Sequence, residues 1–314
     1  MAFEAGAFLS DRIPFRVRPM LATLVADPFD RPGWVYEEKY DGYRVLAYKE
    51  GAETTLLSRN ANDKTAAFDA VARAVARLRR RTLLLDGEVV GFDSDLVSRF
   101  QLLQQGNVPL VYMVFDCLWV DGVDLREQPL RVRRRRLAEV LGPTAKATHL
   151  FCARRLEGDG FAAHREAQAK GWEGIIAKDD AAPYVEGRST KWLKVKVHQQ
   201  DEFVIGGYTA PGGTRTHFGA LLLGAYARGV LHYVGKVGTG FSHKTLATLH
   251  RQFRPLVQKT APFVDPPREK GATWLAPRLV AQIAYHEWTA DKKLRQPVYL
   301  GLRDDKRPDE CRLP

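Results

Sequence analysis

A lysine with a distinctive set of neighbours lies in residues 36–44, whose sequence is YEEKYDGYR. Lys39 is followed by Asp at the second position, Gly at the third and Arg at the fifth. An ammonium ion is not a nucleophile, so a reactive lysine needs surroundings that favour its neutral form. A positioned arginine can hold the phosphate that the amine attacks. The pattern therefore predicts that Lys39 becomes covalently attached to a nucleotide; an exposed edge strand with mixed charges is the alternative.

Five further motifs follow Lys39 in order, and most of them lie on apolar runs typical of buried strands. They are residues 85–88 (LDGE), 112–118 (YMVFDCL), 173–178 (EGIIAK), 191–196 (KWLKVK) and 303–306 (RDDK). In the fourth motif lysine alternates with apolar residues, so on a strand Lys194 and Lys196 share one face. Each motif alone is a weak signal, whereas the ordered set is a strong one.

The ordered set resembles the covalent nucleotidyltransferase superfamily, which comprises ATP-dependent DNA ligases, RNA ligases and messenger-RNA capping enzymes. Residues 18–22 (RPMLA), 233–241 (YVGKVGTGF) and 287–289 (EWT) are similar to bacterial ATP-dependent DNA ligases. The closest resemblance is to the ligase module of the Ku-associated non-homologous end-joining ligases. Because 314 residues leave no room for the polymerase and phosphoesterase modules of many such proteins, we expect a stand-alone ligase or an excised module.

The resemblance implies an α+β fold in two domains. A nucleotidyltransferase (adenylation) domain of mixed antiparallel sheets and helices is expected over residues 1–197, and an OB-fold β-barrel over residues 198–314, with a hinge near 197–200. The sequence agrees, because after Lys196 it changes to short strands separated by Gly-rich turns.

Apolar periodicity predicts several of the elements. Phe68, Val71, Val75 and Leu78 recur at helical spacing, and a helix over 161–170 is ended by Gly171. Residues 36–48 read as one strand. In the second domain the predicted strands are 201–208, 219–226, 230–237 and 280–288, with a helix over 244–253.

Two residues are assigned to the nucleotide base by the resemblance. Glu37 corresponds to the acid that accepts a hydrogen bond from the adenine amino group. Guanine has a carbonyl oxygen at that position, so an ionised Glu37 would repel GTP. Phe115 matches the aromatic residue that stacks on the purine, although an aromatic residue in such an apolar run is more often plain core.

The remaining site residues are assigned to phosphates, ribose and metal. Arg44 and Arg59 match positions that contact AMP or the nick phosphate. Glu88 matches a residue that binds ribose hydroxyls or supports the metal, and Glu173 an acid that holds the catalytic cation; both could instead be salt-bridge partners of arginines. Lys194 and Lys196 are expected to face the α-phosphate. Arg303 and Lys306 match a motif that closes over the β- and γ-phosphates during adenylylation.

The composition suits a polyanionic partner. The chain has 48 Lys+Arg against 37 Asp+Glu, a formal net charge of +11. A ribosome-associated or membrane-surface protein would also fit. Residues 131–136 (RVRRRR) open a predicted helix, either as a solvated face or as a phosphate contact. No stretch resembles a signal peptide or a membrane span, so we expect a cytoplasmic, nucleoid-associated protein.

The chain is therefore predicted to be an ATP-dependent DNA ligase that seals 5′-phosphate/3′-hydroxyl nicks through lysyl-AMP and DNA-adenylate intermediates, in double-strand-break repair. The expected partners are ATP, Mg²⁺ or Mn²⁺, nicked double-stranded DNA, and Ku with end-processing polymerase or phosphoesterase proteins; a monomer is expected. An RNA ligase or a GTP-using capping enzyme is the alternative within the superfamily. A non-catalytic nucleic-acid-binding protein is the alternative outside it.

Overall fold

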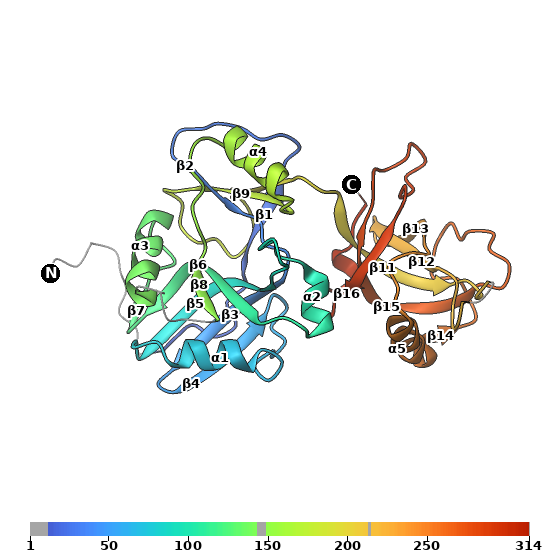
Figure 1. The fold of residues 1–314 in the computed structure, drawn as a ribbon, viewed down its shortest axis with the longest axis horizontal. Coiled ribbons are helices and arrows are strands. Elements are labelled where there is room, and N and C mark those ends of the chain that lie inside the picture. Colours follow the sequence, from blue (N-terminus) through green and yellow to red (C-terminus); the bar gives the residue numbers. More distant parts are fainter. Residues whose placement is uncertain (1–11, 143–148, 213–214, 314) are drawn as a thin grey trace. The chain divides into compact units, whose positions relative to one another are not determined.

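The computed structural model describes residues 12–142, 149–212 and 215–313 (Figure 1). Contacts divide the chain into two compact units, Met1–His198 and Gln199–Pro314. The predicted boundary, between residues 197 and 198, lies one residue from this division. Among the described residues, no helix has the length and apolar character needed to cross a membrane.

The first unit contains two sheets. A four-stranded sheet has the order β1-β10-β9-β2. Its strands are β1 (Met20–Leu24), β10 (Gly187–Lys196), β9 (Gly174–Asp179) and β2 (Trp34–Glu38). Only the β1–β10 pair in this sheet is parallel. Helix α4 (Gly160–Lys170) packs against it through Ala163 and Ala167. Asp159 caps the start of α4 by accepting the N–H of Ala162, and Gly171 ends it in the left-handed conformation, as predicted.

The second sheet of this unit has the order β4-β3-β5-β6-β7, with β8 beside β6. Its strands are β4 (Glu53–Ser58), β3 (Tyr43–Glu50), β5 (Thr82–Gly91), β6 (Leu110–Val120), β7 (Val123–Asp124) and β8 (Leu150–Cys152). Helices α1 (Asp69–Ala76), α2 (Phe100–Gln105) and α3 (Leu130–Leu141) complete the unit. Alternation along the strands gives this sheet two apolar faces, each with its own core.

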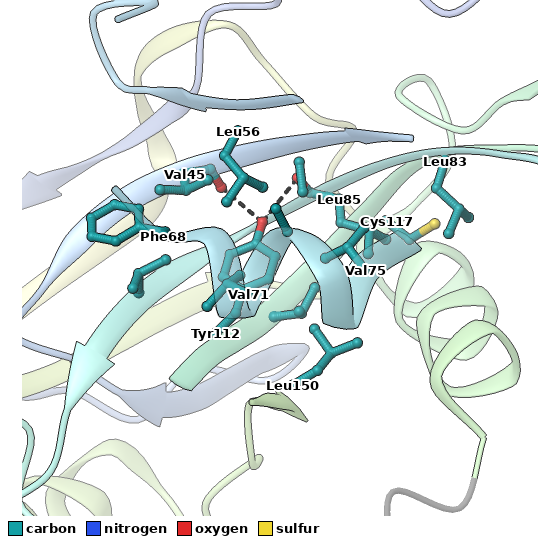
Figure 2. Close-up of a cluster of buried hydrophobic side chains, with 14 of the residues drawn as sticks. Val45, Leu56, Phe68, Val71, Val75, Leu83, Leu85, Tyr112, Cys117 and Leu150 are labelled. Carbon is teal, nitrogen blue, oxygen red and sulfur yellow. Dashed lines mark hydrogen bonds between the residues drawn. The ribbon is translucent and has the colours of Figure 1, made fainter. Parts of the chain in front are cut away.

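One of these cores lies under α1 (Figure 2). Val71 and Val75 of α1 are fully buried against Leu56, Leu83 and Leu85, as the helical spacing predicted. The hydroxyl group of Tyr112 donates toward the carbonyl oxygens of Val45 and Leu85, at 2.8 and 3.1 Å. A buried tyrosine hydroxyl is therefore satisfied without leaving the apolar cluster.

The prediction of one strand over residues 36–48 is wrong. The segment forms the end of β2 and most of β3, which belong to different sheets, and residues 39–42 connect them. The break contains Asp41 and Gly42, a dipeptide typical of turns, and the prediction did not use this signal. Lys39 consequently lies on a crossing between sheets and not within a strand.

The second unit is built on six antiparallel strands in the order β13-β12-β11-β15-β14, with β16 paired to β15. They are β11 (Gln200–Tyr208), β12 (Leu221–Ala227), β13 (Val230–Val237), β14 (Val257–Gln258), β15 (Thr273–Ala284) and β16 (Val298–Leu302). Helix α5 (His243–Phe253), followed by the short helix Arg254–Leu256, buries Leu246, Leu249 and Phe253 in the core. A last short helix spans Pro308–Glu310.

The predicted elements of this unit agree closely except at β15. The strand predicted over 280–288 begins at Thr273 and ends at Ala284. Its pairing with β11 is interrupted by a register shift between Ile205 and Gly207. Pro277 lies in the stretch of β15 opposite this shift. Because proline is uncommon within strands, the first half of β15 was not predicted from the sequence.

Candidate active site

A pocket that is partly open to solvent lies between the two sheets of the first unit. It is lined by Leu21, Ala22, Glu37, Glu38, Lys39, Tyr40, Arg44, Arg59, Glu88, Phe115, Ile176, Lys178, Arg188, Trp192 and Lys194. Most of the predicted site residues of this unit are therefore brought together. The exceptions are Lys196, which does not line the pocket, and Glu173, which reaches it through an ion pair with Lys39.

The four-stranded sheet forms one wall of the pocket through its strand register. Glu37 pairs with Ile176, and Ile176 pairs with Lys194 across the sheet. Trp192 pairs with Lys178 in the next row on the same face. Residues at the alternate positions, including Ala177 and Val195, point into the core beneath α4.

The six-stranded sheet supplies the opposite wall. Arg44 on β3 pairs with Glu88 on β5, and Phe115 comes from β6. The guanidinium carbon of Arg44 lies 4.5 Å from the centre of the Phe115 ring, and the Lys178 ammonium lies 4.4 Å from it. Phe115 is 8% exposed. The aromatic ring is thus held in place by two cations at the base of the pocket.

The backbone around Lys39 is fixed at both ends of the crossing. The Lys39 N–H donates to the carbonyl oxygen of Gly174 at 3.0 Å. The carboxylate of Asp41 accepts the N–H of Phe100 at 3.2 Å, at the start of α2. A Cβ atom at Gly42 would overlap the carbonyl oxygen of Val89. The aspartate and glycine of the lysine motif therefore shape the loop that carries Lys39.

Lys39 forms an ion pair with Glu173, and their side chains are 18% and 8% exposed. Burial alone would lower the pKa of Lys39, but the carboxylate of Glu173, assisted by Asp41 and Glu88, raises it above its ordinary value. Lys39 therefore carries a proton in this state.

Arg44 is oriented by a buried hydrogen-bond network. Its guanidinium donates to both carboxylate oxygens of Asp86, at 2.5 and 2.7 Å, and to the carbonyl oxygen of Met20 at 3.1 Å. The hydroxyl of Tyr184 donates to Asp86 at 2.6 Å and accepts the N–H of Met20 at 2.9 Å. Although burial opposes its charge, Asp86 raises the pKa of Arg44, so the guanidinium stays charged.

Glu37 lies between two cations. The Lys178 ammonium donates to Glu37 Oε2 at 2.6 Å, and both side chains are 2% exposed. On the other side, Arg134 Nη1 lies 3.6 Å from Glu37 Oε1. Arg134 is itself held by hydrogen bonds to the carbonyl oxygens of Phe115 and Ala153.

Arg134 belongs to the arginine-rich run 131–136, for which we weighed a solvated helix face against a phosphate contact. Neither interpretation describes Arg133 and Arg134. Arg133 is fully buried and pairs with Asp116 at 2.8 Å, while Arg134 lies beside Glu37, which lines the pocket. Arg136 pairs with Glu139 on the exposed side. Helix α3 turns Arg133 inward because Leu130, Leu137 and Val140 anchor the same face, and the adjacent Arg134 lies at the edge of that face.

The pocket holds polar atoms that a ligand could satisfy. In the described residues, four buried side-chain polar atoms have no hydrogen-bond partner, and three of them belong to residues that line this pocket: Glu37 Oε1, Glu38 Oε1 and Trp192 Nε1. An unpaired buried acceptor costs free energy. The combination of an aromatic ring, unpaired acceptors and converging cations fits a nucleotide with a purine base.

The number of carboxylates near Lys39 fits a Mg²⁺ ion that is bound together with substrate phosphates. Across the described parts of the chain, no group of three or more His, Cys, Asp or Glu is placed to hold a metal ion. Mg²⁺ is commonly bound through one or two carboxylates together with substrate phosphates and water. Glu173 and Glu88, both close enough to raise the pKa of Lys39, provide that number of carboxylates.

The second unit carries a cluster around Arg303. Its guanidinium donates to both oxygens of Asp305 at 2.8 Å and to Gln282 at 2.7 Å. Lys306 forms an ion pair with Glu202 at 3.0 Å and is 14% exposed, against 7% for Arg303. The two predicted phosphate-binding residues are thus neighbours through Glu202, which also lies 3.8 Å from Arg303.

Several pocket residues were missed from the sequence. Lys178 ends the EGIIAK motif but was given no role, and Trp192, which belongs to a core cluster and also lines the pocket, was not assigned to the site. Arg134 was hidden in a charge run. The alternation of Ile176 with Lys178 on one strand could have placed Lys178 beside Glu37, since both strands were predicted to carry motif residues.

Comparison with known proteins identifies the family. The domain family described as "ATP dependent DNA ligase domain" matches residues 19–196, and "ATP dependent DNA ligase C terminal region" matches residues 214–306. A relative, the multifunctional non-homologous end joining protein LigD of Pseudomonas aeruginosa, is 37% identical over 305 residues. That alignment covers 94% of this chain and 36% of the relative, so the chain spans little more than a third of it.

Two solved structures extend the likeness to the fold. A mycobacterial DNA ligase D complexed with ATP and MES is 35% identical, with a TM-score of 0.71 and coverage of 95% of this chain and 99% of that one. The ligase domain of Mycobacterium tuberculosis LigD is 36% identical, with a TM-score of 0.55 and coverage of 96% and 100%. These matches confirm the predicted α+β fold, a nucleotidyltransferase domain followed by an OB-fold. With matched domain families along most of its length, the chain belongs to the ATP-dependent DNA ligases.

Proposed function

We propose that this chain seals nicks between a 5′-phosphate and a 3′-hydroxyl in duplex DNA, using ATP, and that it does so in double-strand-break repair. The observation that carries the proposal is the position of Lys39. It lies at a pocket with an unpaired adenine-type acceptor, Glu37 Oε1, and with the cations Arg44, Arg59 and Lys194. The names of the relatives support the end-joining context.

In the first step, Lys39 Nζ attacks the α-phosphorus of ATP, an N–P bond forms and pyrophosphate leaves. The AMP then passes to the 5′-phosphate of the nick, and the 3′-hydroxyl displaces it. These in-line substitutions need positioning and charge neutralisation more than covalent help from the protein. Lys194 faces the α-phosphate, Phe115 and Ile176 enclose the base, and Arg44, held by Asp86, contacts AMP or the nick phosphate.

The resting ion pair of Lys39 supports a role for a divalent cation. A cation held by Glu173 and Glu88 would neutralise charge on the phosphates. Once Glu173 is engaged elsewhere, Lys39 loses the partner that raises its pKa, and burial then favours its neutral, nucleophilic form. We propose Mg²⁺ or Mn²⁺ in this role.

The remaining assignments are also proposals. Residues 1–197 form the adenylation domain and 198–314 the OB-fold domain, with a hinge near 197–200. Arg303 and Lys306 act on the β- and γ-phosphates during self-adenylylation, and Lys196 supports Lys194. The protein works as a monomer on nucleoid DNA in the cytoplasm, with Ku and end-processing polymerase or phosphoesterase proteins as partners.

The test starts from the purified chain incubated with Mg²⁺ or Mn²⁺ and either ATP or GTP. Intact mass should show one added AMP from ATP and no adduct from GTP. The labelled protein should then seal a nick in duplex DNA faster than the same nick in RNA. Absence of a nucleotide adduct under all these conditions rejects the proposal, and preferential sealing of RNA redirects it to an RNA ligase.

A further inference from the structure

Two cations of the second unit share one carboxylate oxygen. Glu202 Oε1 lies 3.0 Å from the ammonium nitrogen of Lys306 and 3.8 Å from Nη1 of Arg303. Arg303 also has a counter-ion of its own, because Asp305 accepts two hydrogen bonds from its guanidinium. Among the described residues, Glu202 is the one carboxylate that pairs with Lys306. The position of the Lys306 ammonium therefore depends on Glu202.

The sheet of this unit fixes the carboxylate beside the two cations. Glu202 on β11 pairs directly with Gln282 on β15, so their side chains lie on the same face of the sheet. The Gln282 side chain accepts a hydrogen bond from Arg303 at 2.7 Å, and Arg303 directly follows β16, which pairs with the other edge of β15. Three neighbouring strands thus hold Glu202, Gln282 and Arg303 side by side.

The two cations differ in how firmly they are held. Asp305 and Gln282 orient the planar guanidinium of Arg303 without help from Glu202. Lys306 carries its charge on a flexible four-carbon stem. Because like charges repel, loss of the Glu202 charge would let the Lys306 ammonium turn away from Arg303 into water. An ammonium has three N–H donors, so Lys306 can donate to Glu202 and still reach a phosphate oxygen.

We propose that Glu202 is a positioning residue for self-adenylylation: it holds the Lys306 ammonium beside Arg303, so that both cations meet the pyrophosphate part of ATP together. The inference rests on the proposed function, which assigns the β- and γ-phosphates to these two cations. A lysine that is already ordered loses less side-chain freedom when it binds phosphate. Once pyrophosphate has left, Glu202 has no further part in the reaction.

The experiment follows the first step in both directions with the full chain. Rates of AMP attachment at increasing ATP give one KM, and formation of ATP from the AMP-loaded protein and inorganic pyrophosphate gives a second. Glu202→Gln should raise both KM values about threefold to tenfold, the factor that corresponds to ordering one long side chain. The maximal rates should change by less than about twofold, because the reacting atoms are untouched. Sealing of a nick that already carries 5′-AMP should proceed as in the parent.

Three controls separate positioning from a general disturbance. Glu269→Gln breaks a comparable ion pair in the same unit, with Lys236 at 2.6 Å, and should leave both KM values unchanged. Glu202→Asp keeps the charge on a shorter side chain, so its KM values should fall between those of the parent and Glu202→Gln. Adding Glu202→Gln to Lys306→Ala should raise neither KM further, because the effect of Glu202 passes through Lys306.

Unchanged KM values with Glu202→Gln overturn the proposal, and lower values would mean that the carboxylate competes with phosphate. A further rise in the Lys306→Ala background also overturns it. Equal losses in AMP attachment and in sealing of the 5′-AMP nick would assign Glu202 a structural role instead. Failure of the parent to attach AMP rejects the proposed function, so the two results are distinguishable.

Discussion

Because of Glu38, the free energy of unfolding of the first unit should fall as the pH rises. Glu38 lies beside Glu37 at the end of β2, lines the pocket, and its Oε1 is buried without a hydrogen-bond partner in the described residues. Burial raises the pKa of Glu38 from 4.5 to about 7, against the opposing influence of Arg154 and Lys170. The folded state therefore binds a proton that the unfolded chain releases near pH 4.5.

The size of the effect follows from the two pKa values. Each pH unit between 4.5 and about 7 is worth about 1.4 kcal/mol, so ionisation of Glu38 costs up to about 3 kcal/mol of folding free energy. Below pH 4.5 the carboxyl is neutral in both states and costs nothing. Between pH 4.5 and 7 stability falls as pH rises, and above pH 7 the full cost persists.

The substitution Glu38→Gln removes this ionisation. Urea unfolding of the parent and the variant at pH 5, 6, 7 and 8 gives the difference in unfolding free energy at each pH. From pH 5 to pH 8 the unfolding free energy of the variant should rise relative to that of the parent by up to about 3 kcal/mol. Any effect of the amide group that does not depend on pH adds the same amount at every pH and does not alter this trend. Glu50→Gln, at an exposed position on β3, is the matched control and should show no such trend. A constant difference, or one that shifts against the variant as pH rises, would refute the reasoning.

Three further predictions concern the chemistry. Lys39→Ala should abolish attachment of AMP and sealing of an unadenylylated nick, measured by intact mass and gel assay; a variant that still acquires AMP would mean another nucleophile. Glu173→Gln should make Lys39 react with an amine-specific reagent at lower pH than in the parent, without ATP or metal, because it removes the carboxylate that raises the pKa of Lys39; an unchanged pH profile by peptide mass spectrometry would contradict this. Lys306→Ala should impair self-adenylylation while sparing a nick that already carries 5′-AMP. Arg303→Ala should in addition lose about 3–5 kcal/mol of unfolding free energy, since it removes the cation that pairs with both oxygens of the buried Asp305; equal stability of the two variants would argue against it.

The sequence predicted the site better than the path of the chain through it. Lys39, Glu37, Arg44 and Lys194 were found because each belongs to a short motif, and the alternation of β10 placed Lys194 on one face. The break between β2 and β3 was not found although Asp41 and Gly42 are turn-type residues, because the apolar pattern resumes directly after them and only the pairing shows that the two strands belong to different sheets.

Residues whose roles depend on contacts between distant elements were not predictable in the same way. Arg134 resembles its neighbours in the run 131–136, and only the packing of α3 on β6 turns it toward Glu37. Lys178 ends a recognised motif, but its role depends on the register between β9 and β2. The roles of such residues depend on the residues that they contact, and residue type alone does not predict those contacts.

The anchoring of residues 39–42 at both ends has a consequence for the timing of catalysis. Because the backbone of Lys39 is tied to Gly174 and the following turn is tied to α2, exchange of partners by the amine requires rotation of side chains alone. Side-chain rotations take place in picoseconds to nanoseconds at accessible positions, whereas loop and domain motions extend to microseconds and longer. Release of Lys39 from Glu173 therefore needs no motion of the loop backbone, and we expect a slow phase in adenylylation to report a motion elsewhere in the chain.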